Sequence, residues 1–177
     1  MRSEIACSVV LLAVIAGCKR YPDSYAPPEQ RQPLTFEEPP EFKSFIAMSD
    51  AAAPLHFVKD IRPALEGGAW RWTLKQPTVR LAAPKDHGLK FTAEVAVPGI
   101  TFRDTGPVAI TVAINGHTLE TFTLARPGPH RLEKPIPAGW LRSGDDNTVT
   151  MEIDKLWTEA DGDVQLGFIL TSIGFTE

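Results

Sequence analysis

The chain has 177 residues, 43% of them hydrophobic, and a formal net charge of −4. A mildly acidic protein without basic clusters lacks the positive field that nucleic-acid backbones require, so nucleic acid is not an expected partner. Its two cysteines, Cys7 and Cys18, both lie near the N-terminus, so no disulfide framework is expected in the rest of the chain.

The first residues have the pattern of a secretory signal peptide. Arg2 is followed by the uncharged run Ile5–Ala16 and then by small residues. A helix of this length spans about 18 Å, which is less than the roughly 30 Å of the hydrocarbon core, so the run does not predict a membrane-spanning helix.

The stretch Ile15-Ala16-Gly17-Cys18 resembles the lipobox of bacterial lipoproteins. The resemblance implies that residues 1–17 are a lipoprotein signal peptide and that Cys18 becomes the lipidated N-terminus, with palmitate among its acyl chains. Lys19 stands where an aspartate would favour the inner membrane, so the implied location is the outer membrane of a bacterial cell envelope. The alternative is an ordinary signal peptide with an incidental cysteine.

Residues 18–54 predict a lipidated N-terminus followed by a proline-rich tether. Proline fixes φ and removes a hydrogen-bond donor, which favours an extended spacer. The alternative is that the second half packs along the surface of the domain, because it contains Phe36, Phe42, Phe45 and Ile46. The prolines of the tether are Pro22, Pro27, Pro28, Pro33, Pro39, Pro40 and Pro54.

Residues 55–177 predict one all-β domain, an antiparallel β-sandwich. No window has a sustained helical stripe, whereas short β-rich runs are separated by turn residues. The expected strands are Trp70–Leu74, Thr78–Leu81, Leu89–Val97, Val108–Ile114, Thr118–Leu124, Thr148–Ile153 and Gln165–Phe175.

One β-hairpin can be predicted in detail. Asn115-Gly116 favours a two-residue type I′ turn after Val108–Ile114. With such a turn, Phe122 and Leu124 would fall on the face opposite to the apolar residues of the first strand. We therefore expect a β-bulge near Glu120 or Thr121.

The phrases "NGHTLETF" and "PGPHRLEKPIPAGWLRSGDDNTVTMEI" are similar to the galactose-binding-like jelly roll of carbohydrate-binding modules and glycosidase accessory domains. In such a fold Leu141 would close one end of the sandwich and Gly144 would allow a tight turn. Asn147 would hydrogen-bond to the turn backbone.

A second resemblance brackets the domain. "IRPALEGGAWRWT" and "DGDVQLGFILTSIGF" are similar to β-domains appended to bacterial cell-surface polysaccharide proteins, through Glu66, Arg71 and Trp72 and through Leu166-Gly167. The arginine usually found before Leu-Gly is replaced by Val164-Gln165.

Enzymatic motifs are not found, and no catalytic residue is expected. Acidic residues are present, but nothing in their spacing sets two carboxylates across one bond. There is no Gly-x-Ser-x-Gly motif, and the four histidines lack metal-ligand spacing. Asp161 and Asp163 are weak candidates for a structural calcium site, and no other cofactor is expected.

Sugar binding requires an exposed aromatic ring beside polar groups. Trp140 and Trp157 lie in predicted loops and are the first candidates, followed by Trp72. The alternative for Trp72 and its neighbour Trp70 is that they fill the core. Two further residues, Glu66 and Arg71, are ligand-binding candidates, with a structural ion pair as the alternative.

The leading hypothesis is a lipid-anchored envelope protein whose sandwich binds or organises surface polysaccharide without catalysis. The second is an interaction scaffold that docks onto an envelope protein complex without binding sugar. The third is an accessory to a hydrolytic or transferase subunit.

Overall fold

The computed structural model describes residues 41–177 except 145, 160–161 and 163, all within one compact unit that runs from Pro39 to Glu177. The signal-peptide segment, Cys18 and most of the tether lie outside the described residues, as do the calcium candidates Asp161 and Asp163. No helix in the described part of the chain is long and apolar enough to cross a membrane.

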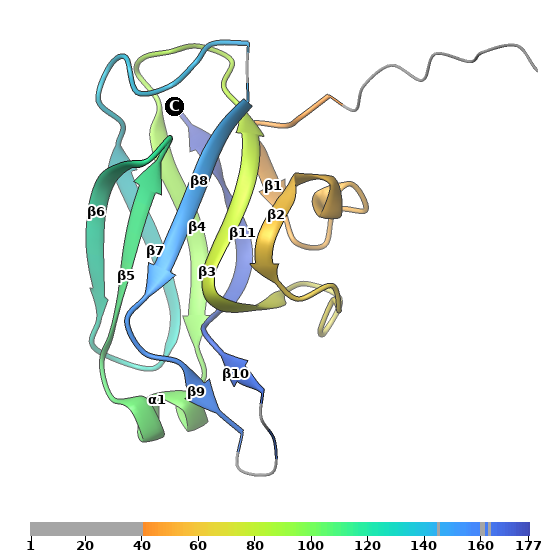
Figure 1. Ribbon diagram of the computed structural model, residues 1–177, viewed down its shortest axis with the longest axis vertical. Coiled ribbons are helices and arrows are strands. Elements are labelled where there is room, and N and C mark those ends of the chain that lie inside the picture. Colours follow the sequence, from red (N-terminus) through yellow and green to blue (C-terminus); the bar gives the residue numbers. More distant parts are fainter. Residues whose placement is uncertain (1–40, 145, 160–161, 163) are drawn as a thin grey trace, which may run out of the picture. The chain divides into compact units, whose positions relative to one another are not determined.

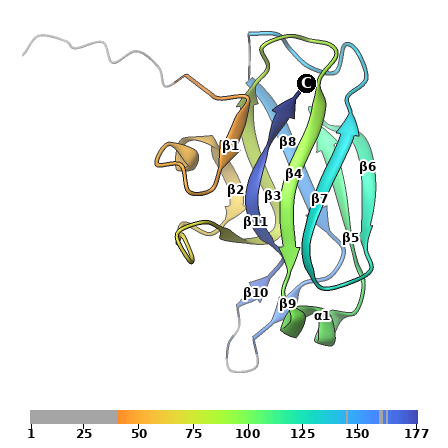
Figure 2. The ribbon, with the colours of Figure 1, turned by 180° about the vertical axis from the view of Figure 1, so that it is seen from behind.

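The described residues form an antiparallel β-sandwich with one short α-helix and one 3₁₀ helix (Figures 1 and 2). The elements are β1 Phe45–Ala47, η1 Ala53–His56, β2 Phe57–Ile61, β3 Arg71–Ala82, β4 Lys90–Val97, α1 Gly99–Thr105, β5 Val108–Ile114, β6 His117–Leu124, β7 Gly128–Pro135, β8 Asp146–Ile153, β9 Trp157–Thr158, β10 Gln165–Leu166 and β11 Ile169–Thr176. The prediction of an all-β antiparallel sandwich is confirmed.

The main sheet has the order β6-β5-β8-β3-β11-β4-β7 and folds into two layers at β3. The C-terminal part of β3 pairs with β8, whereas Arg71 and Trp72 at its beginning pair with β11. Figure 1 shows the β6-β5-β8-β3 layer in front, and Figure 2, seen from behind, shows the layer of β11, β4 and β7 nearest the viewer. Most successive main strands cross between the layers, as in a jelly roll.

The core lies between the two layers, because each strand alternates apolar and polar side chains. In β5, Val108, Ile110, Val112 and Ile114 are buried, and the intervening residues are half-buried on the outer face. This is the pattern that one buried face gives to an antiparallel strand.

The β5–β6 hairpin has the predicted turn and bulge. Asn115 and Gly116 have positive φ angles of 50° and 84°, as a type I′ turn requires. The register shifts so that Leu119 has no partner, one residue before Glu120. The bulge sets Phe122 opposite Ile110, so both face the core.

The turn before β8 also has its predicted geometry. Leu141 is 4% exposed and closes the core at this end, and Gly144 has a φ of 69°. The buried side chain of Asn147 accepts a hydrogen bond from the backbone N–H of Arg142 and donates one to its carbonyl, at 2.8 and 3.0 Å.

Several elements differ from the expected strands. The runs Trp70–Leu74 and Thr78–Leu81 belong to one strand, β3, which continues through Pro77 because its pairing with β2 is irregular there. The expected strand Gln165–Phe175 is divided at Gly167, where a Cβ would lie 2.5 Å from the carbonyl oxygen of Leu74.

Six of the described elements were not expected: β1, η1, β2, α1, β7 and β9. β7 begins with Gly128 and ends with Pro135, residues that do not suggest a strand. It lies at the edge of the back layer, where proline is tolerated. α1 has only seven residues, too few for a helical period to be recognised. β1 lies inside the predicted tether and pairs with β11, so part of the second half of this segment packs on the domain.

Candidate functional site

The four tryptophans lie in three separate places. Trp140 precedes β8 and Trp157 follows it, so these two rings lie at opposite ends of a strand about 26 Å long. Trp70 lies just before β3 and Trp72 at its beginning. The structure therefore does not place Trp140 and Trp157 in one binding site.

Trp140 belongs to the framework of the sandwich. It is half-buried and packs against the hydrophobic core. Its ring lies 5.0 Å from that of His117, and its backbone oxygen accepts a hydrogen bond of 2.8 Å from the side-chain amide of Asn115. Because the core and His117 both contact this ring, Trp140 is held as part of the sandwich framework.

Trp70 and Trp72 face outward rather than into the core. The core cluster of the described residues includes neither of them, although both are half-buried. Their rings meet edge to face with a centroid distance of 5.8 Å. The inward position is taken by Arg71, which pairs with the fully buried Leu170. The alternative that these tryptophans fill the core is therefore wrong.

Glu66 and Arg71 make no ion pair in the described part of the structure. Glu66 is exposed, and its backbone pairs with that of Trp70 across a tight turn. Arg71 is buried, donates a hydrogen bond to the carbonyl of Pro63 and lies 5.4 Å from the ring of Phe57.

Trp157 has the surroundings expected of a binding aromatic. It is half-buried and stands outside the core cluster. Its indole N–H donates a hydrogen bond of 2.8 Å to Oδ2 of Asp104, and Oδ1 of Asp104 accepts one of 2.8 Å from Nε of Arg103. The guanidinium of Arg103, and then the indole N–H, lower the pKa of Asp104 below its ordinary value. The ion pair of Arg103 and Asp104 thus lies at the edge of the Trp157 ring, which its hydrogen bond to Asp104 orients.

Short local elements hold this group in place. Trp157 pairs with Leu166 of β10, which is buried, while Asp104 lies at the end of α1. The first turn of α1 is closed by a hydrogen bond of 2.8 Å from the Thr101 hydroxyl to the Pro98 carbonyl. Lys155 donates to the carbonyls of Thr105 and Pro107 and so ties the end of α1 to the segment before β9.

Asp104 and Arg103 were not among the residues predicted from sequence. The available signal was the stretch "PGITFRDTGP", in which a Pro-Gly pair and a Gly-Pro pair flank six residues. That pattern indicates a turn as readily as a helix. Only the structure sets this segment against Trp157.

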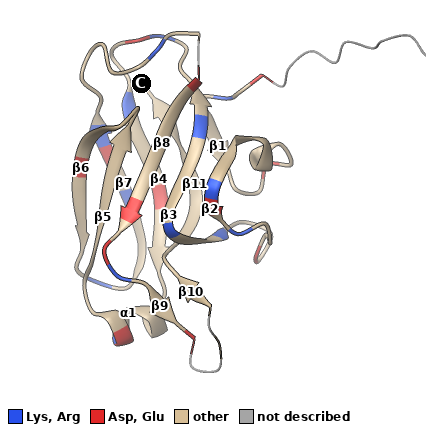
Figure 3. Ribbon diagram, viewed as in Figure 1, with Lys and Arg blue, Asp and Glu red and all other residues tan. Residues whose placement is uncertain are grey.

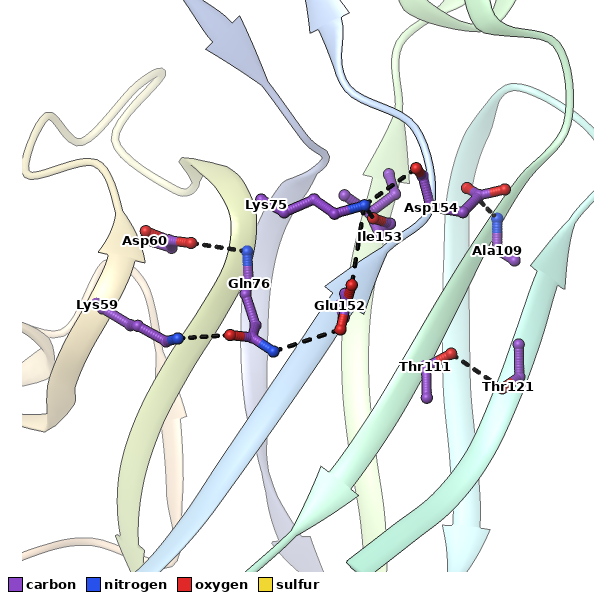
Figure 4. A network of polar contacts seen from close by, with 10 residues as sticks. All are labelled: Lys59, Asp60, Lys75, Gln76, Ala109, Thr111, Thr121, Glu152, Ile153 and Asp154. Carbon is purple, nitrogen blue, oxygen red and sulfur yellow. Dashed lines mark hydrogen bonds and ion pairs between the residues drawn. The ribbon is translucent and has the colours of Figure 1, made fainter. Parts of the chain in front are cut away.

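The outer face of the front layer carries a polar network (Figure 4). Gln76 lies at its centre: its side chain accepts from Lys59 and donates to Glu152 at 3.3 Å, and its backbone N–H donates to Asp60 at 2.8 Å. Lys75 donates to the carbonyls of the segment that follows Glu152. Figure 3 shows that residues of both signs are interspersed over the strands, so no layer has one dominant charge.

The described residues contain no group of three or more histidine, cysteine, aspartate or glutamate side chains that could hold a metal ion. Asp161 and Asp163 lie outside these residues, so the calcium site remains a prediction.

No protein-family model matches the sequence, and no curated protein matches it. Among solved structures, the fold is similar to a family 35 carbohydrate-binding module from Clostridium thermocellum, with 9% identity, a TM-score of 0.44, and coverage of 70% of this chain and 92% of that one. A second family 35 module, from an environmental isolate, has 16% identity, a TM-score of 0.41, and coverage of 75% and 95%.

The chain is also similar to part of a family GH115 4-O-methyl-α-glucuronidase with specificity for decorated arabinogalactans. The identity is 10%, the TM-score is 0.43, and the match covers 79% of this chain but only 18% of the enzyme. The expected likeness to carbohydrate-binding modules is thus found. It concerns the fold alone, and no residue role is transferred from it.

Proposed function

We propose that this protein is a lipid-anchored component of a bacterial cell envelope whose β-sandwich binds surface carbohydrate without catalysis. The observation that carries the proposal is the hydrogen bond from the indole of Trp157 to Asp104, which in turn pairs with Arg103.

The geometry of this group suits a sugar ring. A pyranose has apolar C–H faces and a rim of hydroxyl groups, so it is recognised by an aromatic face with charged or polar groups at its edge. Trp157 is already oriented by its hydrogen bond, which reduces the entropy lost on binding. Asp104 accepts and Arg103 donates, so together they match hydroxyls of either role.

The carbohydrate site is tested by calorimetric titration of a panel of envelope glycans into the purified protein. We expect one class to bind, and Trp157→Ala to weaken binding at least roughly tenfold, if the loss matches the value of about 1–3 kcal/mol measured for the stacking of a nucleic-acid base on an aromatic ring. Trp70→Ala is the matched control, since Trp70 is also half-buried but lies elsewhere. No binding by any glycan, or unchanged binding by the Trp157→Ala variant, would contradict the proposal.

The anchor rests on the Cys18 motif and is tested separately by fractionation. Cys18→Ser should release the protein from the outer-membrane fraction into a soluble one. Retention of the variant by membranes would count against lipidation at this position.

A protein-docking scaffold is the second candidate. It is favoured by Leu55 of η1 and Val58 of β2, whose side chains are 58% and 51% exposed in adjoining elements. Large exposed apolar side chains mark interaction surfaces when they gather in one patch. The test is cross-linking of the protein in intact envelopes. A protein partner that cross-links to the unmodified chain but not to the Leu55→Ser and Val58→Ser variants, together with no binding of any glycan, would support the scaffold.

A further inference from the structure

Arg71 is a buried cation that forms no ion pair in the described part of the structure. The side chain is 6% exposed, although it extends from the beginning of β3 at the side of the sandwich. A guanidinium has five N–H donors. Here Nη1 donates to the carbonyl of Pro63, whereas Nε is buried without a hydrogen-bond partner.

The contacts of Arg71 do not balance its charge. The ring of Phe57, at 5.4 Å, and one carbonyl oxygen offer partial negative charge only. Buried charges are normally paired, because desolvation of an unpaired ion costs several kcal/mol. Two acidic residues of the adjoining strand and turn form no ion pair with Arg71 in the described structure: Asp60 accepts from the backbone N–H of Gln76 at 2.8 Å, and Glu66 is exposed. The environment of Arg71 therefore favours the binding of an anion that is not part of this chain.

An exposed segment, residues 62–69, contacts this side chain through the carbonyl of Pro63. Its base is held by a hydrogen bond of 2.9 Å from Arg62 N–H to the Trp72 carbonyl, and its tip is the Glu66–Trp70 turn, with positive φ angles at Gly67 and Gly68. For Pro63, Ala64 and Leu65, the one described hydrogen bond is the bond from Arg71. Because few contacts hold it, this segment belongs to the part of the fold that opens at low cost.

We propose that Arg71 is an oxyanion-binding residue, and that residues 62–69 move aside to admit the carboxylate or phosphate of an acidic sugar. The planar guanidinium fork binds either group with two parallel hydrogen bonds, and the Nε–H that lacks a partner becomes one of the donors. The site is separate from Trp157 and does not depend on the function proposed for that residue.

Three hexoses that differ in charge test this proposal on the full chain: D-glucose, D-glucuronate and D-glucose 6-phosphate, at equal ionic strength. We expect at least one charged hexose to raise the Tm saturably, by roughly 3 °C at ten times its Kd, and glucose to have no effect. The two charged hexoses distinguish a carboxylate from a phosphate ligand. Equal responses to all three sugars, or no response, would overturn the proposal.

The matched variants are Arg71→Met and Arg62→Met, which remove one charge each from buried and exposed positions of the same region. Arg71→Met should abolish the response, Arg71→Lys should weaken it by losing the fork, and Arg62→Met should keep it. Trp157→Ala should also keep it, which separates this site from the proposed carbohydrate site. Loss of the response in Arg62→Met but not in Arg71→Met would contradict the assignment.

A spectroscopic readout covers the case in which Arg71→Met fails to fold. The Nε–H resonance of Arg71 is assigned in the ¹H–¹⁵N spectrum of the unmodified protein. It should shift on titration with the charged hexose that raises the Tm and stay in place with glucose. An Nε–H resonance that does not move would show that the anion binds elsewhere.

Discussion

The side chain of Asn147 links two turns at one end of the sandwich. Its Oδ1 accepts hydrogen bonds of 2.8 Å from the Asn115 side-chain amide and from the Arg142 backbone. Asn115 in turn accepts a hydrogen bond from the backbone N–H of Thr148 through its own oxygen at 2.9 Å. A buried amide with its donors and acceptors paired adds specificity, because each unsatisfied group would cost about 1–3 kcal/mol. The turn motif predicted the bonds of Asn147 to Arg142 because these are local, whereas its bond to Asn115 joins residues 32 apart in the chain.

Asp104 gives the candidate carbohydrate site a dependence on pH. Arg103 and Trp157 both stabilise the charged carboxylate, so its pKa lies below the ordinary value of 3.8. The interaction is therefore fully present above that ordinary pKa and is lost as the pH falls through the lowered one.

We expect the fluorescence of Trp157 to change in acid, with a midpoint below 3.8, because protonation of Asp104 weakens its bond to the indole. The measurement is a fluorescence titration from about pH 6 to about pH 2. Asp104→Asn should remove this transition while leaving the fold intact. A transition that persists unchanged in Asp104→Asn would assign it to another group.

At the scale of elements, β1 depends on a glycine in its partner strand. Gly174 is opposite Phe45, and a Cβ at Gly174 would lie 2.5 Å from the Cα of Phe45 and from the Ser44 carbonyl. The short strand also buries Ile46 and is held by the bond from Phe175 N–H to Ser44 O at 2.8 Å. A three-residue strand has few bonds, so this close approach decides whether it stays paired.

Gly174→Ala should displace β1 and destabilise the domain by about 2–3 kcal/mol, because the added methyl group overlaps backbone that has little room to move. Urea unfolding measures the loss, and hydrogen exchange at Phe175 N–H should accelerate. Gly99→Ala is the control, since a Cβ there meets nothing within 4 Å. Equal stability of both variants would show that β1 adjusts without strain.

For the molecule as a whole, the two layers must be closed at their free edges. β6 and β7 are the end strands of the sheet order, and Glu120 and Lys134 form an ion pair between them. Glu120 lies opposite the buried Val112, and Lys134 opposite the buried Phe91, so both charges come from core-facing positions. Charged residues at such positions cover the core edge and discourage edge-to-edge pairing.

The extent of the folded unit is tested by comparing chains that begin at residue 41 and at residue 55, the predicted domain boundary. The shorter chain lacks β1 and the fully buried Ile46 and Met48. Losing these two side chains should lower the free energy of unfolding by about 3–6 kcal/mol, a large part of typical domain stability. Chemical denaturation measures both chains, and equal midpoints would show that the segment only rests on the surface.

The sequence by itself determined the sandwich, the β5–β6 hairpin and the turn around Asn147, because alternation, Asn-Gly and Gly-x-x-Asn act over a few neighbouring residues. It also indicated the carbohydrate-binding-module likeness. It did not determine which face of "WRW" is buried, since pairing with Leu170 orients Arg71 inward. Nor did it join Trp157 to Asp104, 53 residues apart. Such contacts depend on strand order and register, which no local sequence pattern encodes. The surroundings of both candidate binding residues, Trp157 and Arg71, arise from these contacts.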